Sequence, residues 1–110
     1  MSSPKQIDLV HLEAAAAQAC RLLKVLSNPD RMLLLCQMTQ DEYCVSDLEE
    51  LTGIKQPTLS QQLTVLREEK LVNVRREGKQ MFYSVASKEA LAVLEVLYEQ
   101  FCKNSKGARK

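Results

Sequence analysis

The amino-acid sequence predicts a mainly α-helical domain with one small β-hairpin. Leucines recur at helical spacing in residues 58–69, which predicts an amphipathic helix. β-Branched and aromatic residues gather in residues 71–76 and 80–85, on either side of a turn at residues 77–79, which predicts the hairpin. Two short helices, a hairpin and a final helix, in that order, are typical of a winged helix-turn-helix.

The chain is expected to begin with two helices separated by a sharp break. Residues 8–26 are rich in alanine, which has the highest helix propensity, and small side chains allow another helix to approach closely. The break falls at residues 27–30, where Pro29 suits the first turn of a second helix that extends to Met38.

Residues 46–69 predict the helix-turn-helix itself. Ser46 followed by Glu49 matches a capping box and predicts a helix start. Gly53 is expected to end that helix, because glycine adopts the left-handed conformation at low cost. Pro57 is then expected in the first turn of the next helix.

The second of these helices has the composition of a DNA-reading helix. Leu59, Leu63 and Leu66 share one side, so short hydroxyl and amide side chains occupy the rest. Such groups near a helix N-terminus reach base edges in the major groove, whereas an ordinary surface hairpin of helices is the alternative interpretation. The residues expected to contact DNA from this segment are Gln56, Thr58, Ser60, Gln61 and Thr64.

The predicted hairpin carries positive charge near its tip, from Arg75, Arg76 and Lys79. Basic side chains beside a polar helix predict contacts to DNA phosphates, which make binding weaken as salt rises. An edge strand protected by charge is the alternative interpretation.

The final predicted helix, residues 88–102, carries more apolar surface than the core of one small domain can bury. A second copy of the chain is the expected partner, because a homodimer matches the symmetry of a pseudo-palindromic DNA site. A monomer with both terminal helices buried internally is the alternative. The apolar side chains concerned are Leu91, Leu94, Val96, Leu97, Tyr98 and Phe101.

Length and composition indicate a single globular domain spanning residues 1–110, with an ordered core at 8–102 and a flexible basic tail at 103–110. The net charge is +1 and 45% of the residues are apolar. No apolar run reaches the length of a membrane span and the first residues do not resemble a signal peptide, so we expect a cytoplasmic protein. Four cysteines then indicate thiol chemistry, metal ligation or packing rather than a disulfide framework.

The sequence does not predict an enzyme or a cofactor. It contains no glycine-rich phosphate loop, nucleophile elbow or pair of catalytic carboxylates. A thiol peroxidase would use two cysteines, but it also needs a pocket with a positioned base or cation. No motif of that kind surrounds the cysteines.

Residues 26–35, 46–67 and the end of the hairpin at Phe82-Tyr83 resemble the ArsR/SmtB family of bacterial winged-helix repressors. The run Gln56-Pro-Thr-Leu-Ser-Gln-Gln-Leu-Thr-Val-Leu-Arg-Glu is specific, and the resemblance covers nearly all of residues 8–102. Within the family the chain is most similar to the BigR/SqrR branch, which senses sulfane sulfur through a cysteine pair. The resemblance implies a homodimeric repressor that leaves its operator when an inducer reacts, and that regulates genes for sulfide and persulfide detoxification.

By this resemblance Cys36 and Cys102 are the reactive pair, and persulfides or polysulfides are the inducers. A simple disulfide needs the two Cα atoms within ~7 Å of each other. Each additional S–S bond, of ~2 Å, increases the distance that a sulfur bridge can span. A pair held slightly too far apart for a disulfide would therefore favour polysulfide, and a general thiol-redox repressor is the alternative. Packing offers another alternative, since Met32, Leu35 and Cys36 share one face of a helix and a buried thiol acts as a small hydrophobe.

A metal-responsive or arsenite-responsive repressor of the same family is the second alternative. Sensors of soft metals in the family carry Cys-Val-Cys-Asp-Leu, whereas this chain has Cys44-Val45-Ser46-Asp47-Leu48, with one thiol missing. Zinc sensors use carboxylates and His on the last helix, and the only histidine here is His11 on the first. We therefore assign no metal ligand, although Cys20, Cys44 and Cys102 could meet across a dimer. Cys20 and Cys44 receive no role from the resemblance.

Overall fold

The computed structural model describes residues 8–103, and its elements follow the predicted order. Of the predicted basic tail, 103–110, only Lys103 belongs to this described part. The elements are α1 (Leu9–Leu26), α2 (Pro29–Gln37), β1 (Tyr43–Cys44), α3 (Val45–Thr52), α4 (Thr58–Glu68), β2 (Val72–Glu77), β3 (Gln80–Val85), α5 (Lys88–Leu97) and a π-helical turn, η1 (Tyr98–Lys103).

The starts of the first two helices are confirmed. The carboxylate of Asp8 accepts a hydrogen bond from the Val10 amide at 3.3 Å, which caps α1. The side chain of Asn28 accepts from the Arg31 amide at 3.0 Å, and Pro29 opens α2. Helix α2 ends one residue before the predicted Met38, which is its C-cap.

The turn between α3 and α4 is confirmed at Gly53, whereas both predicted helix starts around it are wrong. Gly53 has a φ of 78° and its amide donates to the Glu49 carbonyl, as in a left-handed C-cap. Helix α3 begins at Val45 without a side-chain cap, because β1 holds Cys44 in an extended conformation directly before it and leaves Ser46 inside the first turn. Pro57 precedes α4 as its N-cap residue, because α4 begins at Thr58.

The predicted hairpin is confirmed, and it belongs to a three-stranded antiparallel sheet in the order β1-β3-β2. Tyr43 pairs with Tyr83, which joins the segment before α3 to the hairpin. The sequence did not predict β1, because two residues are too short to display an alternating pattern. The consequence is that the hairpin, called the wing below, is anchored beside the first turn of α3.

One apolar core holds the helices and the sheet together. Leu34 and Leu35 from α2, Leu48 from α3 and Leu59 and Leu66 from α4 are all fully buried. The predicted inward face of α4 is therefore confirmed, and burying each leucine contributes roughly 1.5–3 kcal/mol.

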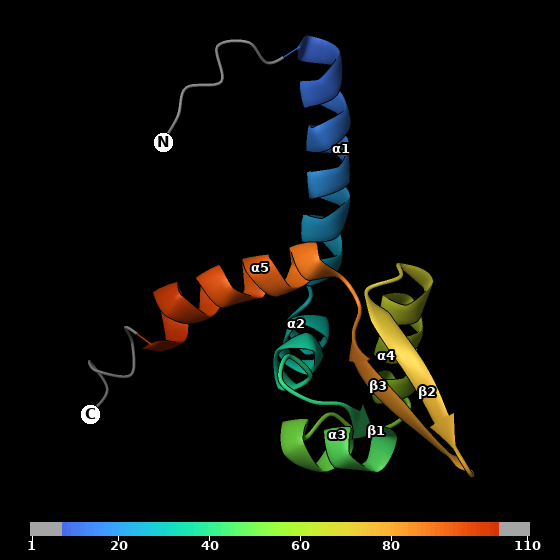
Figure 1. Cartoon of the computed structure of the whole chain (residues 1–110). Coiled ribbons are helices and arrows are strands. Elements are labelled where there is room, and N and C mark those ends of the chain that lie inside the picture. The colour runs from blue at the N-terminus through green and yellow to red at the C-terminus, as the bar shows by residue number, and fades with distance from the viewer. Residues whose placement is uncertain (1–7, 104–110) are drawn as a thin grey trace.

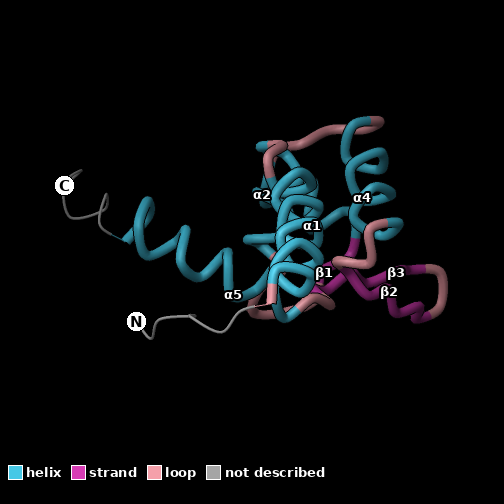
Figure 2. The backbone as a smooth tube through the Cα atoms, turned by 90° about the horizontal axis from the view of Figure 1, so that it is seen from above, coloured by secondary structure: helices cyan, strands magenta, loops and turns pink. Residues whose placement is uncertain are grey.

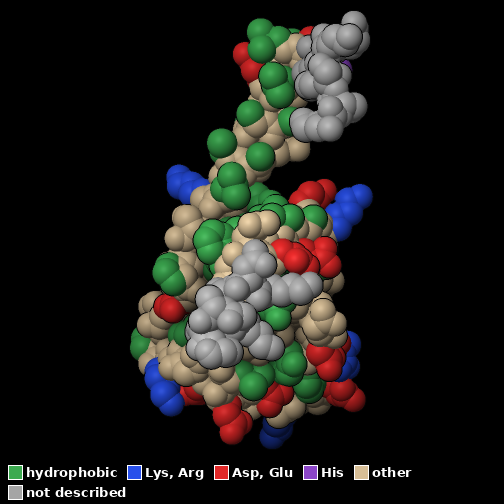
Figure 3. Space-filling model, turned by 90° about the vertical axis from the view of Figure 1, so that its left-hand side faces the viewer, with side chains coloured by type: hydrophobic (Ala, Val, Ile, Leu, Met, Phe, Trp, Pro, Cys, Tyr) green, Lys and Arg blue, Asp and Glu red, His purple; other side chains and the backbone are tan. Residues whose placement is uncertain are grey.

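Helices α1 and α5 extend away from this body in different directions, as two perpendicular views show (Figures 1 and 2). Apolar side chains along them remain exposed, with Val10 of α1 68% and Val96 of α5 58% accessible. Hydrophobic side chains are visible along the projecting α1 (Figure 3). The last helix was predicted to continue to Cys102, but its α-helical part ends at Leu97 and the chain continues as η1. No described helix is both long and apolar enough to cross a membrane.

Candidate functional site

The polar residues predicted to contact DNA lie on the solvent side of α4. Ser60, Gln61 and Thr64 are exposed, and Thr58 is half-buried. The Thr64 hydroxyl donates to the Ser60 carbonyl at 2.8 Å, so its proton is used within the helix. Within residues 8–103 the side-chain amide of Gln61 makes no hydrogen bond to the protein, which leaves both its NH₂ donor and its oxygen acceptor available.

Gln56 has a structural task at the start of α4. Its side-chain oxygen accepts a hydrogen bond from the Ser60 amide at 3.0 Å, in the position where an N-cap side chain normally acts. The NH₂ group of Gln56 is not used in that bond. Gln56 therefore caps α4 and also presents an exposed NH₂ donor beside the N-terminal end of this helix. That end carries the partial positive charge of the helix dipole.

Arg75 on the wing is held by carboxylates of the same chain. Its Nη2 lies 2.6 Å and its Nε 2.8 Å from Glu42, and its Nη1 lies 2.9 Å from Glu77. The guanidinium also lies over the Phe82 ring, 4.9 Å from its centre. The hydrogen bonds to Glu42 and then Glu77 raise the pKa of Arg75. A phosphate would have to displace these carboxylates.

The partner Glu42 was not predicted from the sequence. It lies one residue before β1, and the pairing of β1 with β3 brings it beside the wing. The opposite charges of Glu42 and Arg75 were the only sequence signal for this ion pair. Charge alone does not identify a partner more than thirty residues away.

The two other basic residues of the wing are less restrained. Arg76 is exposed, and its Nε donates to the Gly78 carbonyl over a long 3.4 Å. Lys79 is exposed and forms no ion pair within the described part of the chain. Both cations are free to meet a phosphate without breaking an internal ion pair.

Cys102 affects the pKa of Cys36, although the two residues lie on different helices. Although Cys36 is exposed, partial burial of its thiol raises the pKa of Cys36, and the charge of Cys102 raises that pKa further, so the two sulfurs lie within electrostatic range. Both residues are exposed in the single chain. The interpretation of Cys36 as a core thiol is therefore wrong, because α2 buries Leu34 and Leu35 and turns Cys36 outward.

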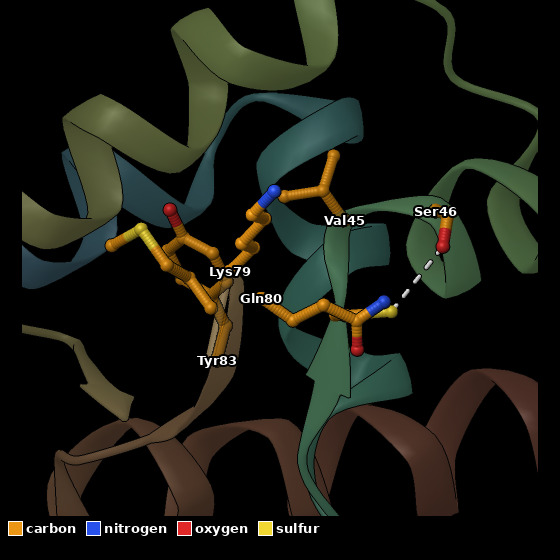
Figure 4. A pocket seen from close by; sticks show the side chains of 7 residues that line it. Val45, Ser46, Lys79, Gln80 and Tyr83 are labelled. Carbon is orange, nitrogen blue, oxygen red and sulfur yellow. Dashed lines mark hydrogen bonds between the residues drawn. The ribbon is translucent and has the colours of Figure 1, made fainter. Parts of the chain in front are cut away.

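Cys44 lines a pocket of about 260 Å³ between the start of α3 and the wing (Figure 4). Its sulfur lies 3.3 Å from the Ser46 hydroxyl. Lys79 lines the same pocket, and an ammonium group disfavours a bound cation. Among residues 8–103 of one chain, no three His, Cys, Asp or Glu side chains are grouped to hold a metal ion. Cys20 is exposed on α1.

A second pocket, of about 510 Å³, lies between α1 and the start of α5. Its walls include Ala15, Ala19 and Leu22 on α1 and Val93 on α5. The polar residues Gln18 and Glu89 complete the lining, so the hollow between the two projecting helices is mainly apolar with a polar part.

Comparison with known proteins gives one consistent result. Residues 28–74 match the family described as "Bacterial regulatory protein, arsR family". The chain is 46% identical over 97 residues to the biofilm growth-associated repressor of Agrobacterium fabrum, which covers 88% of this chain and 83% of that repressor.

Solved structures agree in fold. The crystal structure of the transcriptional repressor BigR from Xylella fastidiosa is 43% identical, with a TM-score of 0.81 over 87% of this chain and 98% of that one. The homodimeric winged helix-turn-helix DNA-binding domain from Mycobacterium bovis is 26% identical, with a TM-score of 0.72 over 96% of this chain and 95% of that one.

Replacing Cys102→Ser is expected to lower the pKa of Cys36. The replacement removes the second of the two causes that raise this pKa and leaves burial in place, so the pKa falls only part of the way to its ordinary value. Because only the thiolate is alkylated, the Cys36 rate should rise at lower pH in the variant. Mass spectrometry of iodoacetamide-treated peptides across pH measures this midpoint.

The matched control is Cys20→Ser, which removes an exposed thiol on α1 and should leave the Cys36 midpoint unchanged. An unchanged or higher midpoint in Cys102→Ser would show that the two thiols are not electrostatically coupled.

Proposed function

The chain belongs to the ArsR family of bacterial regulatory proteins and is a transcriptional repressor similar to BigR, and from this premise we propose that it senses persulfides and polysulfides. Cys36 and Cys102 are the sensing residues, and linking them releases operator DNA. The observation that carries the proposal is the electrostatic effect of Cys102 on Cys36, two exposed thiols from distant parts of the sequence.

A homodimer is the proposed DNA-binding form. The exposed apolar side chains of α1 and α5, and the mainly apolar hollow between these helices, support a second copy as the partner. The M. bovis domain of the same fold is a homodimer. Two copies of α4 spaced by ~34–36 Å would enter successive major grooves on one side of the DNA.

In this proposal α4 reads bases and the wing holds phosphates. The exposed amide of Gln61 is free to make a paired contact with an adenine, and Thr58, Ser60 and Thr64 line the same approach. Gln56, through its NH₂ group, and the wing residues Arg75, Arg76 and Lys79 contact the backbone.

The sulfur chemistry of the proposal balances without an outside oxidant. Two persulfide molecules, each written RSSH, transfer two sulfur atoms to one thiol and leave as two RSH. The thiolate of the other cysteine then attacks the middle sulfur of the Cys–S–S–SH group. The terminal sulfur departs as HS⁻, and one additional sulfur atom bridges Cys36 and Cys102. Longer donors or further transfers extend the bridge.

Cross-linking would change the geometry of the reading helices. Cys36 lies on α2, which packs in the core against α4, and Cys102 lies in η1 beyond the projecting α5. A bridge between them ties the body that carries α4 to the helix proposed to contact the partner. A coupling of ~1–3 kcal/mol is sufficient to alter affinity by about five- to 150-fold.

Treatment of the reduced protein with glutathione persulfide is expected to link Cys36 to Cys102 through at least one additional sulfur atom. Peroxide and glutathione disulfide, applied in parallel, should not give this product. Intact mass followed by peptide mapping identifies the linked pair and counts its sulfur atoms.

Cys20→Ser is the matched control for that reaction and should form the same product, whereas Cys36→Ser should not. The absence of a Cys36–Cys102 link under every reagent would contradict persulfide sensing and would make metal titration the next experiment. A relaxed disulfide formed readily with peroxide would instead indicate a general thiol-redox repressor.

Two exposed residues should separate base reading from phosphate binding. Gln61→Ala is expected to weaken binding to a duplex that the wild-type protein selects from a random pool more than binding to a scrambled duplex, by ~1–3 kcal/mol for the lost paired contact. Arg76→Ala should weaken both duplexes and reduce the salt slope by roughly one unit. Fluorescence anisotropy over a salt series measures both effects.

Equal losses on the two duplexes would show that Gln61 does not read bases. A salt slope unchanged in Arg76→Ala would remove Arg76 from the phosphate contacts.

A further inference from the structure

The side chain of Arg31 joins three helices at the corner behind α4. Its Nε donates to the carbonyl of Val25, in the last turn of α1, at 2.7 Å. Its Nη1 donates to the side-chain oxygen of Gln62, on α4, at 2.9 Å. Arg31 itself lies in the first turn of α2. One planar guanidinium therefore connects the end of α1, the start of α2 and the middle of α4.

The base of this connection is rigid. Val25 is buried, and the Arg31 amide is held by the Asn28 side chain that caps α2. Arg31 is half-buried, and both oxygens that accept from it are neutral. A guanidinium presents its donors in a fixed fork, so the direction of Nε toward Val25 also determines the direction of Nη1 toward Gln62.

Gln62 and Gln61 have different environments on α4. Successive residues of an α-helix point about 100° apart, since a turn contains 3.6 residues. Gln62 is half-buried and bound to Arg31, whereas Gln61 is exposed. The packing of Leu59, Leu63 and Leu66 determines which side of α4 faces the core, but apolar contacts are less directional than a hydrogen bond. The directional bond from Arg31 restricts the rotation of α4 about its axis.

We propose that Arg31 is a positioning residue for DNA recognition, which through Gln62 holds α4 in the rotation that directs Gln61 outward. This inference rests on the proposed role of α4 in reading DNA. Loss of the bond leaves the leucine face of α4 in the core and allows only small rotations of the helix about its axis, so the contacts that require exact direction weaken most.

The test uses Arg31→Met and Gln62→Met in the full chain, alone and combined. Each replacement leaves an unbranched side chain and removes the Arg31–Gln62 hydrogen bond. Methionine matches glutamine in length and is shorter than arginine, and Arg31→Met also removes the bond to the Val25 carbonyl. Arg21→Met is the matched control, because Arg21 forms an exposed contact of 3.1 Å with Glu69 after the end of α4. The DNA probes are a duplex that the wild-type protein selects from a random pool and a scrambled duplex of the same composition.

Each single variant is expected to bind the selected duplex about tenfold more weakly, with a change below about twofold on the scrambled duplex. The double variant should bind no more weakly than Arg31→Met, because the bond that Gln62→Met removes is already lost in that variant. Arg21→Met should stay within about twofold on both duplexes. Equal losses on the two duplexes, or additive losses in the double variant, would overturn the proposal.

Amide hydrogen exchange along residues 58–68 tests the bond independently of DNA. Faster exchange in Arg31→Met and Gln62→Met than in Arg21→Met supports the positioning role, and equal exchange in all three overturns it. A wild-type protein that selects no duplex would contradict DNA reading by α4 itself, and the exchange rates would still decide whether Arg31 restrains this helix.

Discussion

Burial of one leucine face on α4 is the constraint on which the rest of the structure depends. Leu59, Leu63 and Leu66 can enter the core only if the opposite side of this helix faces solvent, and that side carries Ser60, Gln61 and Thr64. Because the core is shared with Leu34 and Leu35 of α2 and Leu48 of α3, it also places the helix that carries Cys36 directly behind the reading helix. The helix proposed to sense sulfur and the helix proposed to read DNA thus pack on one shared core.

The same core is too small to cover the whole chain. It leaves most of α1 and the end of α5 with exposed apolar side chains, among them Leu9, Val10 and Val96. These helices extend from the body in different directions and border a mainly apolar hollow, which is the geometry expected of a subunit that completes its apolar contacts with a second copy. Cys102 lies just beyond one of these helices and Cys36 in the body, so a sulfur bridge would act between the interface and the reading head.

Local sequence signals predicted the elements well, and contacts between distant residues poorly. Gly53 and the leucines of α4 were predictable because a left-handed C-cap and a helical period depend on neighbouring residues only. The capping box at Ser46 failed because β1, which has no local pattern, fixes where α3 begins. The bonds of Arg75 to Glu42 and of Arg31 to Gln62 were not predicted, because a charged or amide residue carries no signal for a partner thirty positions away. The thiol pair was inferred from family resemblance, and its electrostatic coupling is visible only in three dimensions.

The central claim is that linking Cys36 to Cys102 releases DNA, and a direct test is the affinity of one protein preparation before and after linking. Fluorescence anisotropy at fixed salt would compare the reduced protein, the persulfide-treated protein and the treated protein after reduction with dithiothreitol on the selected duplex. The account predicts a loss of about five- to 150-fold on linking and full recovery on reduction. Equal affinity of the reduced and linked proteins would contradict it.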